Sequence, residues 1–112
     1  MKTMEISAFP PLDYACVEAI NSLCTNLTFC GNDVKRIMLT SCRGGEGKTF
    51  LTMNAARTMA GLGKKIAVLD ADLRRSSIAA VYGLNAGRGV DYGITHYLAG
   101  KCEMGDILYM TF

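Results

Sequence analysis

Apolar side chains recur at helical spacing in two stretches of the chain. The first stretch follows Asp13, which can cap a helix that starts at Tyr14, and Gly31 can end that helix. Its apolar face consists of Val17, Ile20, Cys24 and Leu27. The second stretch begins near Lys48 and ends at residues 61–63, with an apolar face of Leu51, Ala55, Met59 and Leu62. Both stretches predict amphipathic helices.

Two short, continuous apolar runs predict strands that are buried on both faces. The first lies within residues 34–40 and the second within residues 65–69. Along the chain the order is strand, glycine-rich loop, helix and strand, which is the order of a right-handed βαβ unit. The pattern therefore predicts an α/β fold in which helices flank a parallel sheet.

The rest of the chain predicts only short helices. Ser76 or Ser77 can cap one that reaches Tyr82, a second covers residues 91–98, and a partial one covers residues 106–109. No internal repeat, low-complexity stretch or linker interrupts the chain. Residues 1–112 are therefore predicted to belong to a single domain.

Composition and charge narrow the class of protein. The 112 residues carry 12 Lys and Arg against 10 Asp and Glu, a formal net charge of +2, and half are apolar. This balance favours a globular protein without a nucleic acid partner and excludes a disordered chain. No apolar run approaches the roughly 18 residues that span a bilayer. Because residues 1–14 also lack the apolar segment of a secretory signal, we expect a cytoplasmic protein.

The cysteines are expected to be reduced. Their number is odd, no C-x-x-C pair occurs, and the single histidine, His96, has no cysteine at metal-ligand spacing. The sequence predicts mostly packing thiols, rather than disulfides or a metal centre, at Cys16, Cys24, Cys30, Cys42 and Cys102.

A glycine-rich loop at residues 43–49 lies between the first predicted strand and the second predicted helix, which is the place of a phosphate-binding loop in a P-loop NTPase-like sheet. Its glycines let successive N–H groups face an anion, and the helix adds the positive end of its dipole. Lys48 would reach the β- and γ-phosphates of ATP, and the Thr49 hydroxyl would bind Mg²⁺. The alternative is a glycine turn with an exposed lysine. The candidate cofactor-binding residues here are Arg43, Gly44, Gly45, Glu46, Gly47, Lys48, Thr49 and Phe50.

The loop is a variant of the usual pattern. Cys42 stands where G-x-x-x-x-G-K-[ST] has its first glycine. Arg43 stands where the MinD/ParA class of P-loop ATPases carries a second, signature lysine. An arginine there could touch phosphate, although a solvated surface arginine is an equal alternative.

Two carboxylates, Asp70 and Asp72, follow the second predicted strand, where open α/β sheets place their ligand crevice. In extended backbone they would point to the same side, share Mg²⁺ with Thr49, and let one accept a proton from an attacking hydroxyl. Lys48, Asp70 and Asp72 are therefore the candidate catalytic residues, and Arg74 could neutralise phosphate charge. The alternative places Asp72 and Arg74 in a solvated turn.

These motifs together resemble the bacterial tyrosine kinases of capsular and exopolysaccharide synthesis, the CpsD/CapB family. Residues 70–74 match the D-x-D-x-R of that family at every fixed position, and residues 18–27, 97–100 and 106–108 resemble its flanking segments. The resemblance implies transfer of the γ-phosphoryl group of ATP to tyrosine hydroxyls of protein substrates, in a homo-oligomer. It also implies a membrane-embedded chain-length regulator that activates the kinase and recruits it to the inner face of the membrane.

The chain departs from the family pattern in three places. In the leading helix, Asn21 and Cys24 replace two arginines that family members use for ring assembly, and Phe50 replaces a hydroxyl residue. No apolar strand ending in Asp follows Asp72, so we expect an incomplete fold, truncated before the Walker B strand. The chain is then the N-terminal part of a longer kinase, inactive by itself. The alternatives are a MinD/ParA-type ATPase switch and a non-catalytic module that binds nucleotide or a partner.

Overall fold

The computed structural model describes residues 2–6, 9–31, 33–43, 47–72, 82, 84–85 and 93–111. They divide into two compact units, and each unit is described by itself. One unit comprises Pro11–Leu69, and the other comprises Met1–Pro10 together with Asp70–Phe112. The first unit contains the predicted phosphate-binding loop, and the second contains both candidate carboxylates.

Helix α1 spans Tyr14–Phe29 and begins and ends where the sequence predicts. The Asp13 carboxylate accepts a hydrogen bond from the Cys16 amide at 2.8 Å, so Asp13 is the N-cap. Bonds from the amide and the thiol of Cys16 lower the pKa of Asp13, which keeps the cap ionised at neutral pH. At the other end, Gly31 has a φ of 103°, a left-handed conformation that ends helices and favours glycine.

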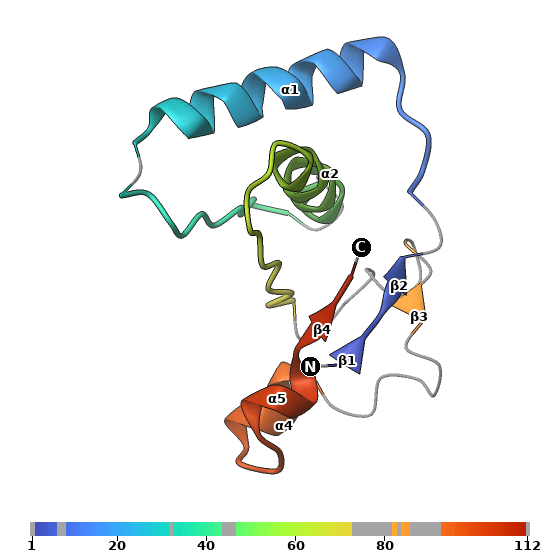
Figure 1. Cartoon of the computed structure of the whole chain (residues 1–112), viewed down its shortest axis with the longest axis vertical. Coiled ribbons are helices and arrows are strands. Elements are labelled where there is room, and N and C mark those ends of the chain that lie inside the picture. Colours follow the sequence, from blue (N-terminus) through green and yellow to red (C-terminus); the bar gives the residue numbers. More distant parts are fainter. Residues whose placement is uncertain are drawn as a thin grey trace. The chain divides into compact units, whose positions relative to one another are not determined.

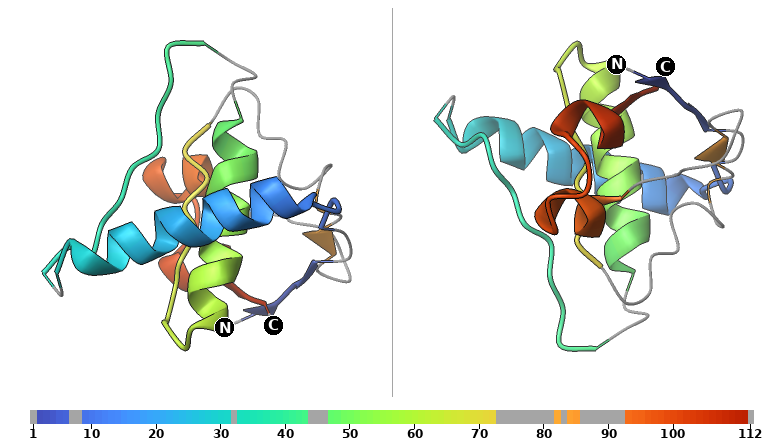
Figure 2. Two further views of the ribbon diagram at one scale, coloured as in Figure 1. Left: turned by 90° about the horizontal axis from the view of Figure 1, so that it is seen from above. Right: turned by 90° about the horizontal axis from the view of Figure 1, so that it is seen from below.

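Helix α2 spans Lys48–Gly61, also as predicted. It lies across α1 in Figure 1, and the view from above in Figure 2 shows the two helices crossing at a steep angle. The core of this unit sits at the crossing, where Ile20 and Cys24 of α1 meet Ala55 of α2. Partly buried side chains complete this core: Leu12, Leu51 and Met59.

Cys24 makes the closest link between the two helices. It is 1% exposed, its thiol donates a hydrogen bond to the Ala55 carbonyl with Sγ and O 3.7 Å apart, and burial raises its pKa. Ala55 has only a methyl side chain, so the helix backbones can approach each other there. Among the described cysteines only Cys24 is fully buried, whereas Cys30 and Cys42 are exposed, so packing accounts for fewer of the thiols than expected.

The second unit is built from short elements. Strand β1 (Lys2–Thr3) pairs in parallel with β4 (Tyr109–Met110), and β2 (Glu5–Ile6) pairs antiparallel with β3 (Leu84–Asn85). Helices α4 (Ile94–Leu98) and α5 (Met104–Ile107) precede β4. Tyr82 is buried, and its ring meets that of Phe9 edge to face at 5.1 Å between centroids.

The expected parallel sheet is not seen in the described part of the chain. Residues 34–40 and 65–69 form no strand, and every residue in them except Leu39 is exposed. A strand requires a neighbour to bond its N–H and C=O groups and to cover its faces, and these two segments pair with none of the four described strands. The two runs are apolar, as strands buried on both faces require, but in this structure neither of them forms a strand. The predicted strands at residues 34–40 and 65–69 are therefore not seen.

The short helices are partly confirmed. Helix α4 matches the end of the helix predicted at residues 91–98, whose first two residues lie outside the described ranges. The helix predicted at residues 106–109 was misplaced, because α5 begins two residues earlier and Tyr109 belongs to β4. The helix predicted to end at Tyr82 lies outside the described residues except for Tyr82 itself. No helix in the described ranges is long and apolar enough to cross a membrane.

One isoleucine pair tests the difference between the observed core and the predicted sheet. Ile20 is 5% exposed at the helix crossing, whereas Ile37 in the unpaired segment is 47% exposed. Ile20→Ala should lower the free energy of unfolding by about 2–4 kcal/mol through lost burial and a cavity, and Ile37→Ala by less than about 0.5 kcal/mol. Urea denaturation of both variants measures the difference. Equal losses would mean that residues 34–40 are packed in solution, contrary to the structure.

Candidate functional site

The start of α2 is shaped by Gly47. This residue caps the helix with φ 88° and ψ 17°, in the left-handed region, and its carbonyl accepts the first helical hydrogen bond, from the Leu51 amide at 2.9 Å. Glycine has no side chain that could bond the free amides of the first turn, and among the residues that the structure describes no side-chain cap bond is present at this end. The first-turn amides and the positive end of the helix dipole are therefore available to an anion.

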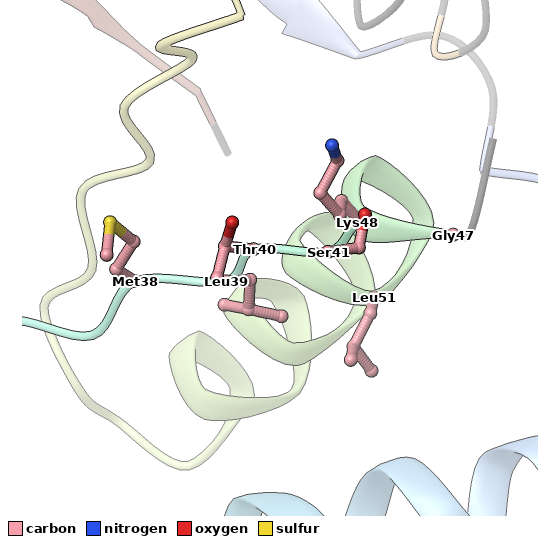
Figure 3. A pocket seen from close by; sticks show the side chains of 7 residues that line it. All are labelled: Met38, Leu39, Thr40, Ser41, Gly47, Lys48 and Leu51. Atoms are coloured by element: carbon pink, nitrogen blue, oxygen red, sulfur yellow. The ribbon is translucent and has the colours of Figure 1, made fainter. Parts of the chain in front are cut away.

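A pocket of about 370 Å³ adjoins this helix start. Its lining, labelled in Figure 3, comes from the chain at residues 38–41 and from Gly47, Lys48 and Leu51 at the start of α2. In that view the Lys48 side chain extends away from Leu51, so a cationic part and an apolar part of the lining are separated. Lys48 is half-buried and is the first residue of α2, so a cationic side chain belongs to the same turn as the free amides.

The chain that enters the loop is held by Ser41. The Ser41 hydroxyl donates a hydrogen bond to the carbonyl of Arg43, with 2.7 Å between the oxygens. Both Cys42 and Arg43 are exposed. The predicted residues Gly44, Gly45 and Glu46 lie outside the described ranges. Sequence reasoning did not single out Ser41, although a serine just before a glycine-rich turn is a signal for this kind of local bond.

Side chains farther along α2 bond the carbonyls of its first turn. Thr52 Oγ1 donates to the Lys48 carbonyl at 2.7 Å, and Asn54 Nδ2 donates to the Phe50 carbonyl at 2.9 Å. Asn54 is buried, Thr49 is half-buried, and Phe50 is partly exposed. These bonds leave the amides of the first turn untouched and fix the turn that carries Lys48 and Thr49.

The two candidate carboxylates belong to the other unit. The Asp72 amide donates to Asp70 Oδ1 at 3.1 Å, so the two residues form a local turn. Residues 70–72 belong to none of the described strands, the bond agrees with the alternative in which Asp72 lies in a turn, and the expectation that both side chains point to the same side stays a prediction. Asp70 is half-buried and Asp72 is exposed, which gives them different surroundings. Arg74 lies outside the described residues.

The chemistry of these residues fits a nucleotide better than a metal bound by protein alone. Within the described ranges, no three His, Cys, Asp or Glu side chains form a cluster that could hold a metal ion. Mg²⁺ usually keeps several waters and takes one or two protein oxygens together with substrate phosphates. The Thr49 hydroxyl and the Asp70 and Asp72 carboxylates are donors of this kind.

Comparison with known proteins decides the family. The family model that matches is ParA, described as the NUBPL iron-transfer P-loop NTPase, and it covers residues 33–98, which include the loop and both carboxylates. The chain belongs to the ParA family of P-loop NTPases. No solved structure matches it significantly.

The relatives of this chain include tyrosine-protein kinases and an antiactivator. Tyrosine-protein kinase CpsD of Streptococcus agalactiae is 35% identical over 94 residues, 84% of this chain and 40% of that protein. CpsD of Streptococcus pneumoniae is 37% identical over 87 residues, 78% of this chain and 37% of that protein. Antiactivator FleN of Pseudomonas aeruginosa is 34% identical over 77 residues, 69% of this chain and 26% of that protein. The predicted similarity to capsular tyrosine kinases is confirmed, and the chain spans less than half the length of these relatives.

Gly47 and Gly61 provide a matched test of the helix start. A methyl group added to either meets nothing within 4 Å, but only Gly47 has a positive φ. Gly47→Ala should lower the free energy of unfolding by about 1–2 kcal/mol because the left-handed conformation strains a β-carbon. Gly61→Ala in helical backbone should be neutral or stabilising. Urea denaturation of both variants measures this contrast, and a Gly47 variant as stable as the wild type would show that the left-handed cap is not formed.

Proposed function

We propose that this chain is the nucleotide-binding part of an ATP-dependent protein-tyrosine kinase that regulates capsular or exopolysaccharide synthesis. The observation that carries the proposal is the position of Lys48, the first residue of α2, beside uncapped amides and a pocket. The similarity to CpsD kinases over most of the chain supports the choice of activity.

The loop residues bind the phosphates in this proposal. Lys48 carries the fixed charge for the β- and γ-phosphates, and the amides of the first turn of α2 bind phosphate oxygens. Thr49 offers its hydroxyl to Mg²⁺, and Arg43 offers a second cation. Bound Mg·ATP supplies the phosphoryl group that is transferred. The same assignment gives Gly44, Gly45 and Glu46 to the phosphate loop.

The two carboxylates, Asp70 and Asp72, have different roles in this proposal. Asp70 binds Mg²⁺, and Asp72 orients the tyrosine hydroxyl of the substrate and accepts its proton. Arg74 neutralises phosphate charge. The half-buried position of Asp70 and the exposed position of Asp72 support this division, because a protein substrate approaches from solvent.

The partners in this proposal follow from the kinase resemblance. A membrane-embedded chain-length regulator activates the kinase and recruits it from the cytoplasm to the inner face of the membrane. Tyrosine-containing proteins are the substrates, and subunits of a homo-oligomer phosphorylate one another. Nucleic acid has no role.

A second candidate function is an ATPase switch of the MinD/ParA type. The similarity to antiactivator FleN favours it, as does Arg43 at the place of the signature lysine of that class. The two functions are distinguished by product: a switch dimerises on ATP without phosphotyrosine, whereas a kinase forms phosphotyrosine.

Removal of the lysine charge tests the phosphate site. In the protein expressed from its natural gene, Lys48→Met should abolish phosphotyrosine formation, because a fixed charge at a transferring phosphoryl group is worth several kcal/mol. Western blotting with an anti-phosphotyrosine antibody measures the loss. Lys64→Met, at an exposed residue beyond α2, is the matched control and should keep wild-type signal. Wild-type phosphorylation by the Lys48 variant would refute the phosphate-loop assignment.

Charge removal at the carboxylates tests their separate roles. Asparagine can still accept the Asp72 amide, so Asp70→Asn keeps the turn and removes only charge. Asp70→Asn should weaken the Mg²⁺ dependence of ATP binding. Asp72→Asn should leave Mg·ATP affinity near wild type and lower the transfer rate by about 100-fold, a typical contribution of a general base. Calorimetric titration and phosphotyrosine kinetics measure the two effects, and equal losses of Mg·ATP affinity would contradict the division.

A further inference from the structure

We propose that Tyr14 is a phosphate acceptor of this kinase and that a second copy of the chain phosphorylates it. This inference rests on the proposed function and names one tyrosine on which the site acts. The side chain of Tyr14 is 80% exposed, whereas Tyr82 is buried and Tyr97 and Tyr109 are half-buried. Tyr92 lies outside the described residues. Among the tyrosines that the structure describes, Tyr14 alone is open to another protein.

The position of Tyr14 in α1 accounts for its exposure. It is the first residue of the helix and shares a stripe with Glu18 and Asn21, which follow at helical spacing and are also exposed. The buried residues of α1, Ile20 and Cys24, lie on another face of the helix. Figure 2 shows α1 extending beyond α2 on both sides of the crossing. The phenol therefore takes no part in the core, and its hydroxyl is presented to solvent.

The charge at the start of α1 is opposite to that of the proposed phosphate site. Asp13 caps the helix, Glu18 lies one turn farther along it, and residues 3–34 contain no Lys or Arg. The phosphate site carries two cations, the exposed Arg43 and the half-buried Lys48. Opposite charges speed the encounter of two proteins and favour the orientation in which the charged patches face each other. The start of α1 in one copy therefore complements the start of α2 in another.

The phosphoryl group must come from another copy. Tyr14 does not line the pocket of its own chain, and the packing of α1 on α2 at their crossing holds it in place. In the transfer, the Tyr14 hydroxyl oxygen forms a bond to the γ-phosphorus of ATP held by the second copy. The bond between that phosphorus and the oxygen that bridges to the β-phosphorus breaks, and ADP leaves. The hydroxyl proton passes to Asp72 of the second copy, as in the proposed function.

Mass spectrometry of the protein expressed from its natural gene locates the phosphate. Trypsin cuts after Lys2 and Lys35 and releases residues 3–35, in which Tyr14 is the only tyrosine. We expect phosphate on the tyrosine of this peptide and none there after Tyr14→Phe, which removes one exposed hydroxyl. Phosphotyrosine at other residues but not at Tyr14 would overturn the inference and leave the proposed function intact. No phosphotyrosine anywhere in the protein would overturn both.

A mixture of two variants tests transfer between copies. Lys48→Met lacks the charge of the phosphate site but retains Tyr14, and Tyr14→Phe lacks the acceptor but retains the site. Phosphate on Tyr14 in the mixture can therefore come only from the other chain. We expect it in the mixture and in neither variant alone. Phosphate on Tyr14 in the wild type but not in the mixture would overturn transfer by a second copy.

Charge reversal tests the attraction between the two surfaces. Glu18→Lys places a cation one turn from Tyr14 and should lower the initial rate of its phosphorylation about two- to fivefold, the size of an exposed charge interaction. Asp33→Lys makes the same change of charge at an exposed residue beyond the opposite end of α1 and is the matched control, with the rate unchanged. A Glu18 variant as fast as the wild type would overturn the role of charge in bringing the copies together.

Discussion

The contact between Cys24 and Ala55 is the interaction on which the unit of Pro11–Leu69 depends. It joins α1 to α2 at their crossing, where small side chains let the helices approach, and apolar side chains from both helices surround it. Helix α2 is held there through its middle, while its first residue, Lys48, extends to the pocket. The helix core therefore fixes the start of α2, where Lys48 lines the pocket.

The segments on either side of α2 could form strands only by pairing with parts of the chain that are distant in sequence. Residues 34–40 and 65–69 are apolar enough for strands buried on two faces, yet in the structure they are exposed and unpaired. A helix satisfies its own hydrogen bonds, whereas a parallel strand depends on neighbours that are distant in sequence. Met38, 85% exposed, illustrates the consequence: its side chain lies in solvent although its pattern is that of a core residue.

The same distinction explains what the sequence could predict. The bounds of α1 and α2 follow from local signals. Asp13 caps the start of α1 and Gly31 follows its end, Gly47 and Gly61 mark the two ends of α2, and apolar residues recur at helical spacing in both helices. The place of Lys48 at a helix start was predictable for the same reason. Strand pairing was not, because it is non-local. The bond from the Asp72 amide to the Asp70 carboxylate agrees with the alternative of a turn, because an Asp side chain can bond nearby backbone instead of continuing a strand.

Phosphate binding and phosphoryl transfer make unequal demands on this chain. In the proposed site, binding needs a left-handed glycine, a free helix end and one cation, and Gly47, α2 and Lys48 would provide these within a few consecutive residues. Such a local arrangement does not by itself distinguish a kinase from an ATPase switch, and the chain is similar both to CpsD and to antiactivator FleN. Transfer to tyrosine needs in addition a carboxylate within hydrogen-bond reach of the acceptor hydroxyl. In the proposed kinase Asp72 supplies it, so the activity depends on a side chain outside the unit that binds the phosphates.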